Sequence, residues 1–527
     1  MSTTQGVAMA RYEELTAERS PVLARARQAA TLTVPHLLPP EGHSGATELP
    51  TPFQSMGARG VRNLSSKLLL TQFPPNVPFF KYDPDEYIVE AIVQKAGIEG
   101  RGEVEKALSR RERSVCKESD KLQFRPAAFE AFRQLLVAGN VLLHTPEDGI
   151  AQTFRLDRFV VKRDWGGKVL EIVLKQTFSP SSLPLDAQAI IQGQDGKPTL
   201  KTVDLYTYIK WDGKKFYEVF QEVEGHVIPS SRGKYKEDRC PWLALRLSKI
   251  DGEDYGRGYV EECLGDLISL EGLSQTMVEG SAAAAKIVIL VNPNGVTRED
   301  DISQAENGDV KTGKADDVHV LQADKRGDFA VVESQIEKLE QRLAYMFLLN
   351  ASVQRQGERV TAEEIRYMAQ DLEDALGGMY TVLAQEFQLP LVSLFSARME
   401  KRKGVPKLPK ELNNPTITTG VDALGRGQDL KNLDNFLIGL GENFGPEVIG
   451  RYVNFSEAIK RRAAALGIDT EGLIKSEQEV QQAEQQAQMT DLATNLGPDA
   501  IKAMANVGGN QLQADAKVKA AQLTKRK

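Results

Sequence analysis

The N-terminal part of the chain alternates between amphipathic helical segments and proline-rich breaks. Tyr12 to Ala30 and Gly57 to Phe73 both carry apolar residues at the spacing of one helix face. Ala127 to His144 begins with helical spacing and changes to a strand-like run after Gly139-Asn140. Residues 1–150 are therefore predicted to be mainly helical.

The hydrophobic pattern changes to the shorter period of β-strands between about residues 151 and 247. Short runs rich in Val, Ile, Phe and Tyr are separated by Trp165-Gly166-Gly167 and by Asp212-Gly213, where glycine supplies the positive φ that hairpin turns need. This pattern predicts a small antiparallel β unit with a polar loop around 180–200.

Two long helical stripes follow and enclose a compact insertion. The first begins at Tyr259 and is expected to end at Gly280. The second has the four- and three-residue steps of helices that pack side by side. Its members are Val332, Ile336, Leu339, Leu343 and Met346. The insertion holds two short β-branched runs, 287–291 and 318–321, which are predicted as strands.

Helical patterns continue toward the C-terminus. Residues 361–403 open with a capping box, Thr361-Ala-Glu-Glu364, and Gly377-Gly378 should bend this long helix. Residues 404–475 are predicted helical after a proline-containing connector, and the Gln- and Ala-rich segment 476–527 is helical at most. The fold class predicted from these patterns is mainly α with a small antiparallel β unit (α+β).

Composition narrows the classes of protein. The chain has 527 residues, of which 41% are apolar and 26% charged, as in globular proteins with several packed units. Its net charge of −7 excludes a bulk polycation but allows contact with DNA through a few cations. Three distant cysteines predict free thiols in a reducing compartment. No apolar run approaches the ~18–20 residues that span a bilayer, and no signal peptide is apparent, so an aqueous, cytoplasm-like location is expected.

The nearest approach to a catalytic motif is Gly308 to Ala315 (GDVKTGKA). It matches the phosphate-binding loop G-x-x-x-x-G-K until its last position, where alanine replaces the Ser or Thr that binds magnesium. No useful helix is predicted after it, so a surface hairpin is the favoured interpretation. The five histidines lack metal-ligand spacing. No catalytic residue, metal site or cofactor is predicted.

Two polar segments remain as candidates for function. Residues 292–317 carry seven acidic against three basic residues, which indicates a solvated loop, a docking surface for a basic partner, or a rim that repels DNA. The candidate docking residues are Arg298, Glu299, Asp300, Asp301, Asp316 and Asp317. The decapeptide 351–360 holds Arg355 and Arg359 and is longer than a simple turn requires, although an ordinary inter-helix loop remains the alternative.

Seven longer blocks of sequence carry a resemblance to a known family. They are 51–70, 136–143, 251–259, 262–270, 291–295, 354–367 and 420–430. These blocks resemble the portal proteins, or head-to-tail connectors, of short-tailed bacteriophages of the autographivirus kind. The resemblance covers nearly the whole chain and fades in the Gln- and Ala-rich C-terminal segment.

The resemblance implies a ring, usually a dodecamer, at one capsid vertex, through which double-stranded DNA is packaged and ejected. It also implies an architecture of wing, stem, clip and crown. The implied parts are the helical wing 1–150, the β-rich wing 151–258, the stem helices 259–285 and 330–350, the clip 286–329, the tunnel loop 351–360, the long kinked helix 361–403, the crown 404–475 and the tail 476–527.

Site residues and partners follow from the same resemblance. Arg359, Arg355, Gln354 and Gln356 would face DNA in the tunnel without reading sequence, and Gly377-Gly378 would be a hinge. The implied partners are other copies of the chain, the terminase packaging motor, the tail adaptor and tail proteins, the major capsid and scaffolding proteins, internal core proteins and double-stranded DNA, with no membrane. The implied location is the virion, after assembly in the host cytoplasm.

Two other functions remain open at this point. A nucleotide-driven packaging motor or nuclease would use the near-match at 308–314 and would hydrolyse ATP. A non-conducting tail or scaffold protein would lack an axial hole. The residues favour a protein that is not an enzyme.

Overall fold

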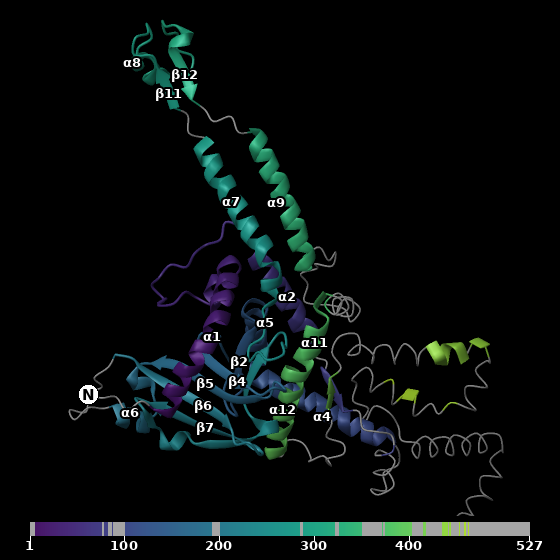
Figure 1. The fold of residues 1–527 in the computed structure, drawn as a ribbon. Coiled ribbons are helices and arrows are strands. Elements are labelled where there is room, and N and C mark those ends of the chain that lie inside the picture. The colour runs from purple at the N-terminus through teal and green to yellow at the C-terminus, as the bar shows by residue number, and fades with distance from the viewer. Residues whose placement is uncertain are drawn as a thin grey trace, which may run out of the picture. The chain divides into compact units, whose positions relative to one another are not determined.

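The structure is a computed structural model that divides the chain into two units, Met1–Gly425 and Arg426–Lys527. It describes residues 6–75, 78–82, 87, 101–191, 201–284, 288–321, 326–349, 372, 375–402 and 415–417, with short stretches between 435 and 462. Figure 1 shows the helices and strands of these residues. All elements discussed below belong to the first unit.

The helices predicted in the N-terminal part are confirmed. They are α1 (Val7–Leu32), α2 (Met56–Gln72) and α5 (Phe124–Ala138), with the 3-10 turn η1 (Pro35–Leu37) after α1. A further helix, α4 (Arg101–Lys121), lies in the region expected to be mainly helical. Helix α5 ends at Gly139 (φ +71°), and β2 (Asn140–His144) begins there, as predicted. A Cβ atom at Gly139 would lie 2.4 Å from the carbonyl carbon of Arg257, so only glycine fits this turn.

The antiparallel β unit is also confirmed, and it consists of two sheets. A three-stranded sheet has the order β10-β2-β3, and a six-stranded sheet has the order β4-β5-β6-β7-β8 with β9 paired to β7. The strands are β3 (Gln152–Phe154), β4 (Phe159–Arg163), β5 (Val169–Phe178), β6 (Val203–Trp211), β7 (Phe216–Val223), β8 (His226–Val227), β9 (Gly233–Lys236) and β10 (Trp242–Arg246).

The connections of this region agree with the turn chemistry, with one exception. Gly167 (φ +92°) and Gly213 (φ +78°) lie in the hairpins that join β4 to β5 and β6 to β7. The polar loop expected around 180–200 contains a helix instead, α6 (Leu185–Ile191), because Ala187 and Ile191 are buried against β6 and β7. Three 3-10 turns complete the region, η2 (Pro180–Ser182), η3 (Pro229–Ser231) and η4 (Glu237–Arg239).

Helix α1 is fastened to the six-stranded sheet by two buried charged side chains. Glu222 of β7 accepts hydrogen bonds from the amides of Ala8 (3.0 Å) and Met9 (3.1 Å), where a carboxylate compensates the unpaired amides at a helix start. About three turns further along the helix, Arg19 donates to the carbonyl of Phe159 (2.7 Å) in β4. The β unit and the N-terminal helices therefore form one packed body.

The segment after residue 375 adds a broken helix to this body. Gly377 (φ +47°) precedes α11 (Gly378–Leu383), which continues through the π-helical turn η7 (Ala384–Gln388) into α12 (Leu389–Lys401). The first part of the predicted long helix, up to residue 371, lies outside the described residues. Strand β13 (Pro415–Ile417) pairs with β1 (Phe80–Tyr82), so the prediction of helix directly after the proline-containing connector is wrong at this strand.

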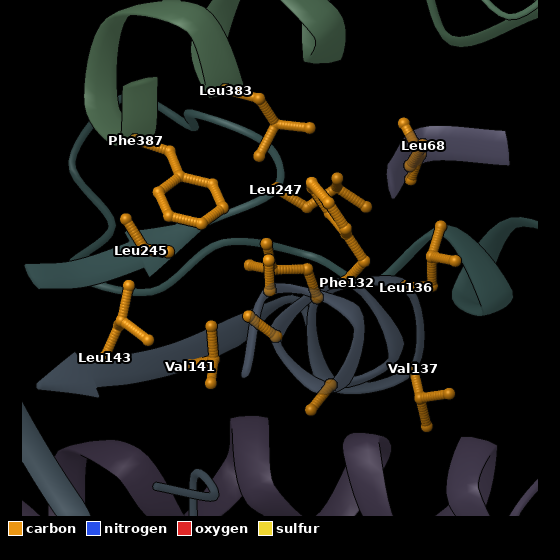
Figure 2. Close-up of a cluster of buried hydrophobic side chains, with 14 of the residues drawn as sticks. Leu68, Phe132, Leu136, Val137, Val141, Leu143, Leu245, Leu247, Leu383 and Phe387 are labelled. Atoms are coloured by element: carbon orange, nitrogen blue, oxygen red, sulfur yellow. The ribbon is translucent and has the colours of Figure 1, made fainter. Parts of the chain in front are cut away.

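The main hydrophobic core lies around α5. Figure 2 shows leucine, valine and phenylalanine side chains from α2, α5, β2, β10 and the α11–η7 segment meeting there. Phe73, Phe124, Phe132 and Phe387 form an aromatic cluster with ring centroids 5.1 to 6.1 Å apart. This core joins segments that are far apart in sequence, and it anchors the two long helices described next.

The two predicted stripes form a pair of long helices that lie side by side (Figure 1). The 3-10 turn η5 (Tyr259–Cys263) leads into α7 (Leu264–Ala284), and the partner helix is α9 (Arg326–Met346). The expectation that Gly280 ends the first helix is wrong. Helix α7 continues to Ala284, and Gly280 instead gives room to the ring of Phe329, from which a Cβ atom would lie 3.0 Å away.

The insertion between the two helices is a small β-ribbon with a long loop. Strands β11 (Val288–Val291) and β12 (Val318–Leu321) pair antiparallel, with Val291 opposite Val318, as the β-branched runs predicted. The loop contains the short helix α8 (Glu299–Ser303) and the 3-10 turn η6 (Ala315–Asp317).

Candidate docking and channel elements

The acidic loop presents most of its candidate docking residues to solvent. Arg298 precedes α8, and Glu299, Asp300 and Asp301 form its first turn. Of these, Asp301 is half-buried and the others are exposed. Asp316 is exposed as well, with its carboxylate 3.7 Å from Lys314 Nζ. These five residues are therefore available to a partner protein.

Asp317 differs from the other candidates because its side chain is turned inward. It is 6% exposed, and its carboxylate accepts hydrogen bonds from the amides of Val296 (2.8 Å) and Thr297 (3.2 Å). Burial alone would raise the pKa of Asp317, but these bonds outweigh that effect and lower it. A Cβ atom at Gly295 would lie 2.4 Å from this carboxyl group. Asp317 therefore holds the loop together, and its assignment to the docking surface is corrected.

The near-match to a phosphate-binding loop does not have the local structure that such a loop requires. After Gly313, the chain makes the three-residue turn η6 and enters strand β12, so no helix N-terminus faces the loop. The amide of Lys314 donates to Thr297 Oγ1 (2.9 Å), which ties the motif to the opposite side of the insertion. The 308–314 segment therefore closes the loop of the insertion, in agreement with the favoured interpretation of a surface hairpin.

The described residues also bear on metal and membrane binding. No group of three or more His, Cys, Asp or Glu side chains in the described part of the chain is placed to hold a metal ion. Among the same residues, no helix combines the length and the apolar character needed to cross a bilayer.

The paired helices α7 and α9 are buried at one end and leave apolar side chains uncovered. Leu270 and Leu343 are fully buried where the helices meet the body. In contrast, four large apolar side chains on the two helices are between 45% and 79% exposed. They are Ile268, Val278, Val331 and Tyr345. These exposed apolar faces are therefore candidates for contact with another protein surface.

The structure describes the candidate hinge glycines but not the candidate tunnel residues. Gln354, Arg355, Gln356 and Arg359 lie outside the described residues. Gly377 has φ +47° and ψ −122°, a conformation that favours glycine and separates α11 from the preceding residues. A change of backbone direction therefore exists where the hinge is expected, and its motion remains a proposal.

Two residues of α2 that contact the end of α9 were not predicted from the sequence. Asn63 Nδ2 donates to the carbonyl of Phe347 (2.9 Å), and Lys67 Nζ donates to that of Leu348 (3.0 Å). Both lie beside apolar positions on the buried face of α2, where a lysine is unusual. A lysine on the apolar face of a helix was the signal that the sequence offered, although the sequence alone does not identify the carbonyl that accepts its hydrogen bond.

Comparison with known proteins gives consistent matches along the chain. The family described as bacteriophage head to tail connecting protein matches residues 5–474. The chain is 40% identical to the portal protein of Escherichia phage T7, covering 91% of this chain and 90% of that protein. It is 39% identical to the portal protein of Enterobacteria phage T3, covering 90% and 89%. A solved structure described as the neck of an empty GTA particle is 10% identical, with a TM-score of 0.34 over 79% of this chain and 90% of that chain.

Proposed function

The chain belongs to the bacteriophage head to tail connecting protein family and acts as a portal, and from this premise we propose how its parts carry out that role. Copies of the chain form a closed ring at one vertex of the capsid, and double-stranded DNA enters and leaves through the axial channel. The observation that carries this proposal is the similarity to named portal proteins along nine-tenths of the chain.

The proposed architecture assigns a place in the ring to each described element. Helices α7 and α9 are the stem, the β11–β12 insertion is the clip, and the N-terminal helices with both sheets are the wing. The exposed apolar side chains of α7 and α9 support this assignment, because neighbouring copies in a closed heterologous ring would bury them. Residues 404–475 are assigned to the crown, and the ring is expected to be a dodecamer.

The proposed DNA contacts are sparse cations on an acidic protein. Arg359 and Arg355, with Gln354 and Gln356, face the duplex from the loop 351–360 and touch its phosphates without reading bases. A net charge of −7 suits a channel in which DNA must slide, because extensive phosphate neutralisation would raise affinity and slow transport. Gly377-Gly378 is the proposed hinge for changes in channel width.

The proposed partners dock at the two ends and around the rim of the ring. The clip surface, formed by Arg298, Glu299, Asp300, Asp301 and Asp316, binds the terminase motor and then the tail adaptor and tail proteins. The wing contacts the major capsid and scaffolding proteins, and the crown contacts internal core proteins. Assembly takes place in the host cytoplasm before the ring becomes part of the virion.

Single-particle imaging of the purified protein tests this proposal. Rings with an axial hole wide enough for a DNA duplex are the expected result. Closed particles without a hole would favour a tail or scaffold protein, and lone molecules at high concentration and in the presence of capsid protein would contradict the ring.

We propose a structural role without enzymatic turnover, and a nucleotide-driven motor is the alternative. The purified ring should not hydrolyse ATP, because the 308–314 segment lacks both the magnesium-binding hydroxyl and the following helix. ATP hydrolysis that is lost on Lys314→Ala would instead establish the alternative.

A further inference from the structure

Helix α9 ends in a Schellman turn that has leucine at the position where glycine is usual. The amide of Leu349 donates to the carbonyl of Ala344 (2.8 Å), and the amide of Leu348 donates to that of Tyr345 (3.1 Å). Leu348 has φ +52°, in the left-handed region that costs a residue with a side chain about 1 kcal/mol. The surroundings must therefore stabilise this conformation.

Three side chains from outside the helix supply that stabilisation. Tyr259 Oη donates to the carbonyl of the last helical residue (2.9 Å). Asn63 Nδ2 donates to the carbonyls of Phe347 (2.9 Å) and Leu348 (3.1 Å), and Lys67 Nζ donates to that of Leu348 (3.0 Å). The last carbonyls of α9, which have no partner within the helix, are thus satisfied by residues elsewhere in the fold.

Helix α2 contributes most of this contact through one of its faces. Gly60, Asn63 and Lys67 follow one another at helical spacing on that face. Lys67 is only 7% exposed and places a positive charge at the negative end of the α9 dipole. The ring of Phe347 lies directly on Gly60, where a Cβ atom would be 2.3 Å from the ring. The two helices are therefore locked together at this point.

We propose that Asn63 and Lys67 are positioning residues. They keep the end of α9 at Met346 and fix where the chain leaves the stem toward residues 351–360. Leu348 holds a conformation that leucine disfavours, so loss of the two side chains would let it leave the left-handed region, and the two hydrogen bonds of the Schellman turn would open more often. This inference rests on the proposed function, because it gives α2 control over the start of the segment that holds Arg355 and Arg359.

Site-resolved hydrogen exchange on the assembled ring tests the inference. Lys67→Met keeps the length of the side chain but removes its donor and charge, and it should speed exchange of the Leu348 and Leu349 amides by at least about tenfold. Arg62→Met is the matched control, since it removes an exposed cation from the same helix and should leave both amides unchanged. Asn63→Ala serves as the second variant if Lys67→Met does not fold.

A rescue variant separates positioning from general packing. Leu348→Gly restores the preference for the left-handed conformation, so adding it to Lys67→Met should return exchange toward the wild-type rate. Unchanged exchange in Lys67→Met and Asn63→Ala, or failure of the rescue, would overturn the inference.

DNA retention in assembled heads provides the functional readout. Lys67→Met should reduce the fraction of DNA-filled heads while rings still form, and Leu348→Gly should restore it. Normal filling despite fast exchange would refute the positioning role but leave the portal function intact. Absence of rings in the wild-type protein would instead refute the proposed function itself.

Discussion

At the scale of single residues, buried charged side chains determine where distant segments meet. Arg246 of β10 is 1% exposed and binds the Glu386 carboxylate of η7 through Nε and Nη2, at 2.8 to 3.1 Å. These partners are 140 positions apart, so the sequence shows two charged residues but not their pairing. Removing Glu386 would leave the buried charge of Arg246 without its carboxylate partner, which is strongly destabilising. The joint between β10 and η7 therefore depends on this pair.

His144 makes the stability of this region depend on pH. Its ring stacks on Trp242 with centroids 3.8 Å apart, and burial followed by the charge of Arg398 lowers the pKa of His144 to about 4. Between pH 6.5 and 4 the unfolded chain binds a proton that the folded chain does not. Stability should therefore fall by up to about 1.4 kcal/mol for each pH unit as pH decreases through this window.

Urea unfolding followed by tryptophan fluorescence between pH 7 and pH 4.5 measures this dependence. His144→Phe, which keeps a ring beside Trp242 but cannot be protonated, should unfold with a smaller pH dependence. Equal pH dependence in the two proteins would mean that other groups account for it.

Arg359 is the residue on which DNA handling is expected to depend most. In the proposed ring, Arg359→Ala would remove one phosphate contact from each subunit, and the loss would be repeated around the ring. Rings should assemble normally, while the fraction of heads that retain DNA falls several-fold, as measured by capsid density. Arg232→Ala, an exposed arginine of the β unit, is the matched control. Normal DNA content in the Arg359 variant would remove this residue from the channel.

At the scale of elements, periodicity predicted most helices and strands, and tertiary contacts explain the exceptions. The stripes of α7 and α9 and the runs of β11 and β12 were visible because their spacing matches one structure type. The prediction that α7 ends at Gly280 was wrong because glycine is common at helix ends, whereas here the missing side chain leaves space for the ring of Phe329. Asp317 was misread because an acid in an acidic loop looks exposed until its partners are known.

The clip loop is expected to act as one charged docking element. Reversing Asp300 and Asp301 to lysine changes the surface of α8 by four charges per subunit without touching the internal bonds of Asp317. Rings should therefore form normally, while binding to the terminase motor or tail adaptor weakens at least about tenfold.

A pull-down with purified motor and adaptor proteins measures this effect. The same reversal at Glu41 and Glu48, two exposed acids of the N-terminal region, is the control for overall charge. Equal binding by all three proteins would return residues 292–317 to the interpretation of a solvated loop.

At the scale of the whole molecule, we expect the paired helices α7 and α9 to fold in a single copy of the chain. Their exposed apolar faces should be buried only by neighbouring copies in the ring. Ile268 and Val278 are 45% and 55% exposed, so replacing both with glutamate should hardly change the fold of a single chain. In the proposed dodecamer each copy would bury these two side chains, so the new carboxylates would have to lose their water at every subunit contact. Native mass spectrometry should therefore detect monomers in place of rings, with unchanged circular dichroism. Leu185→Glu, 82% exposed on α6 and away from these helices, should still assemble. Rings that form equally well from the Ile268 and Val278 variant would show that these faces do not join subunits, and the stem would have to be sought elsewhere in the fold.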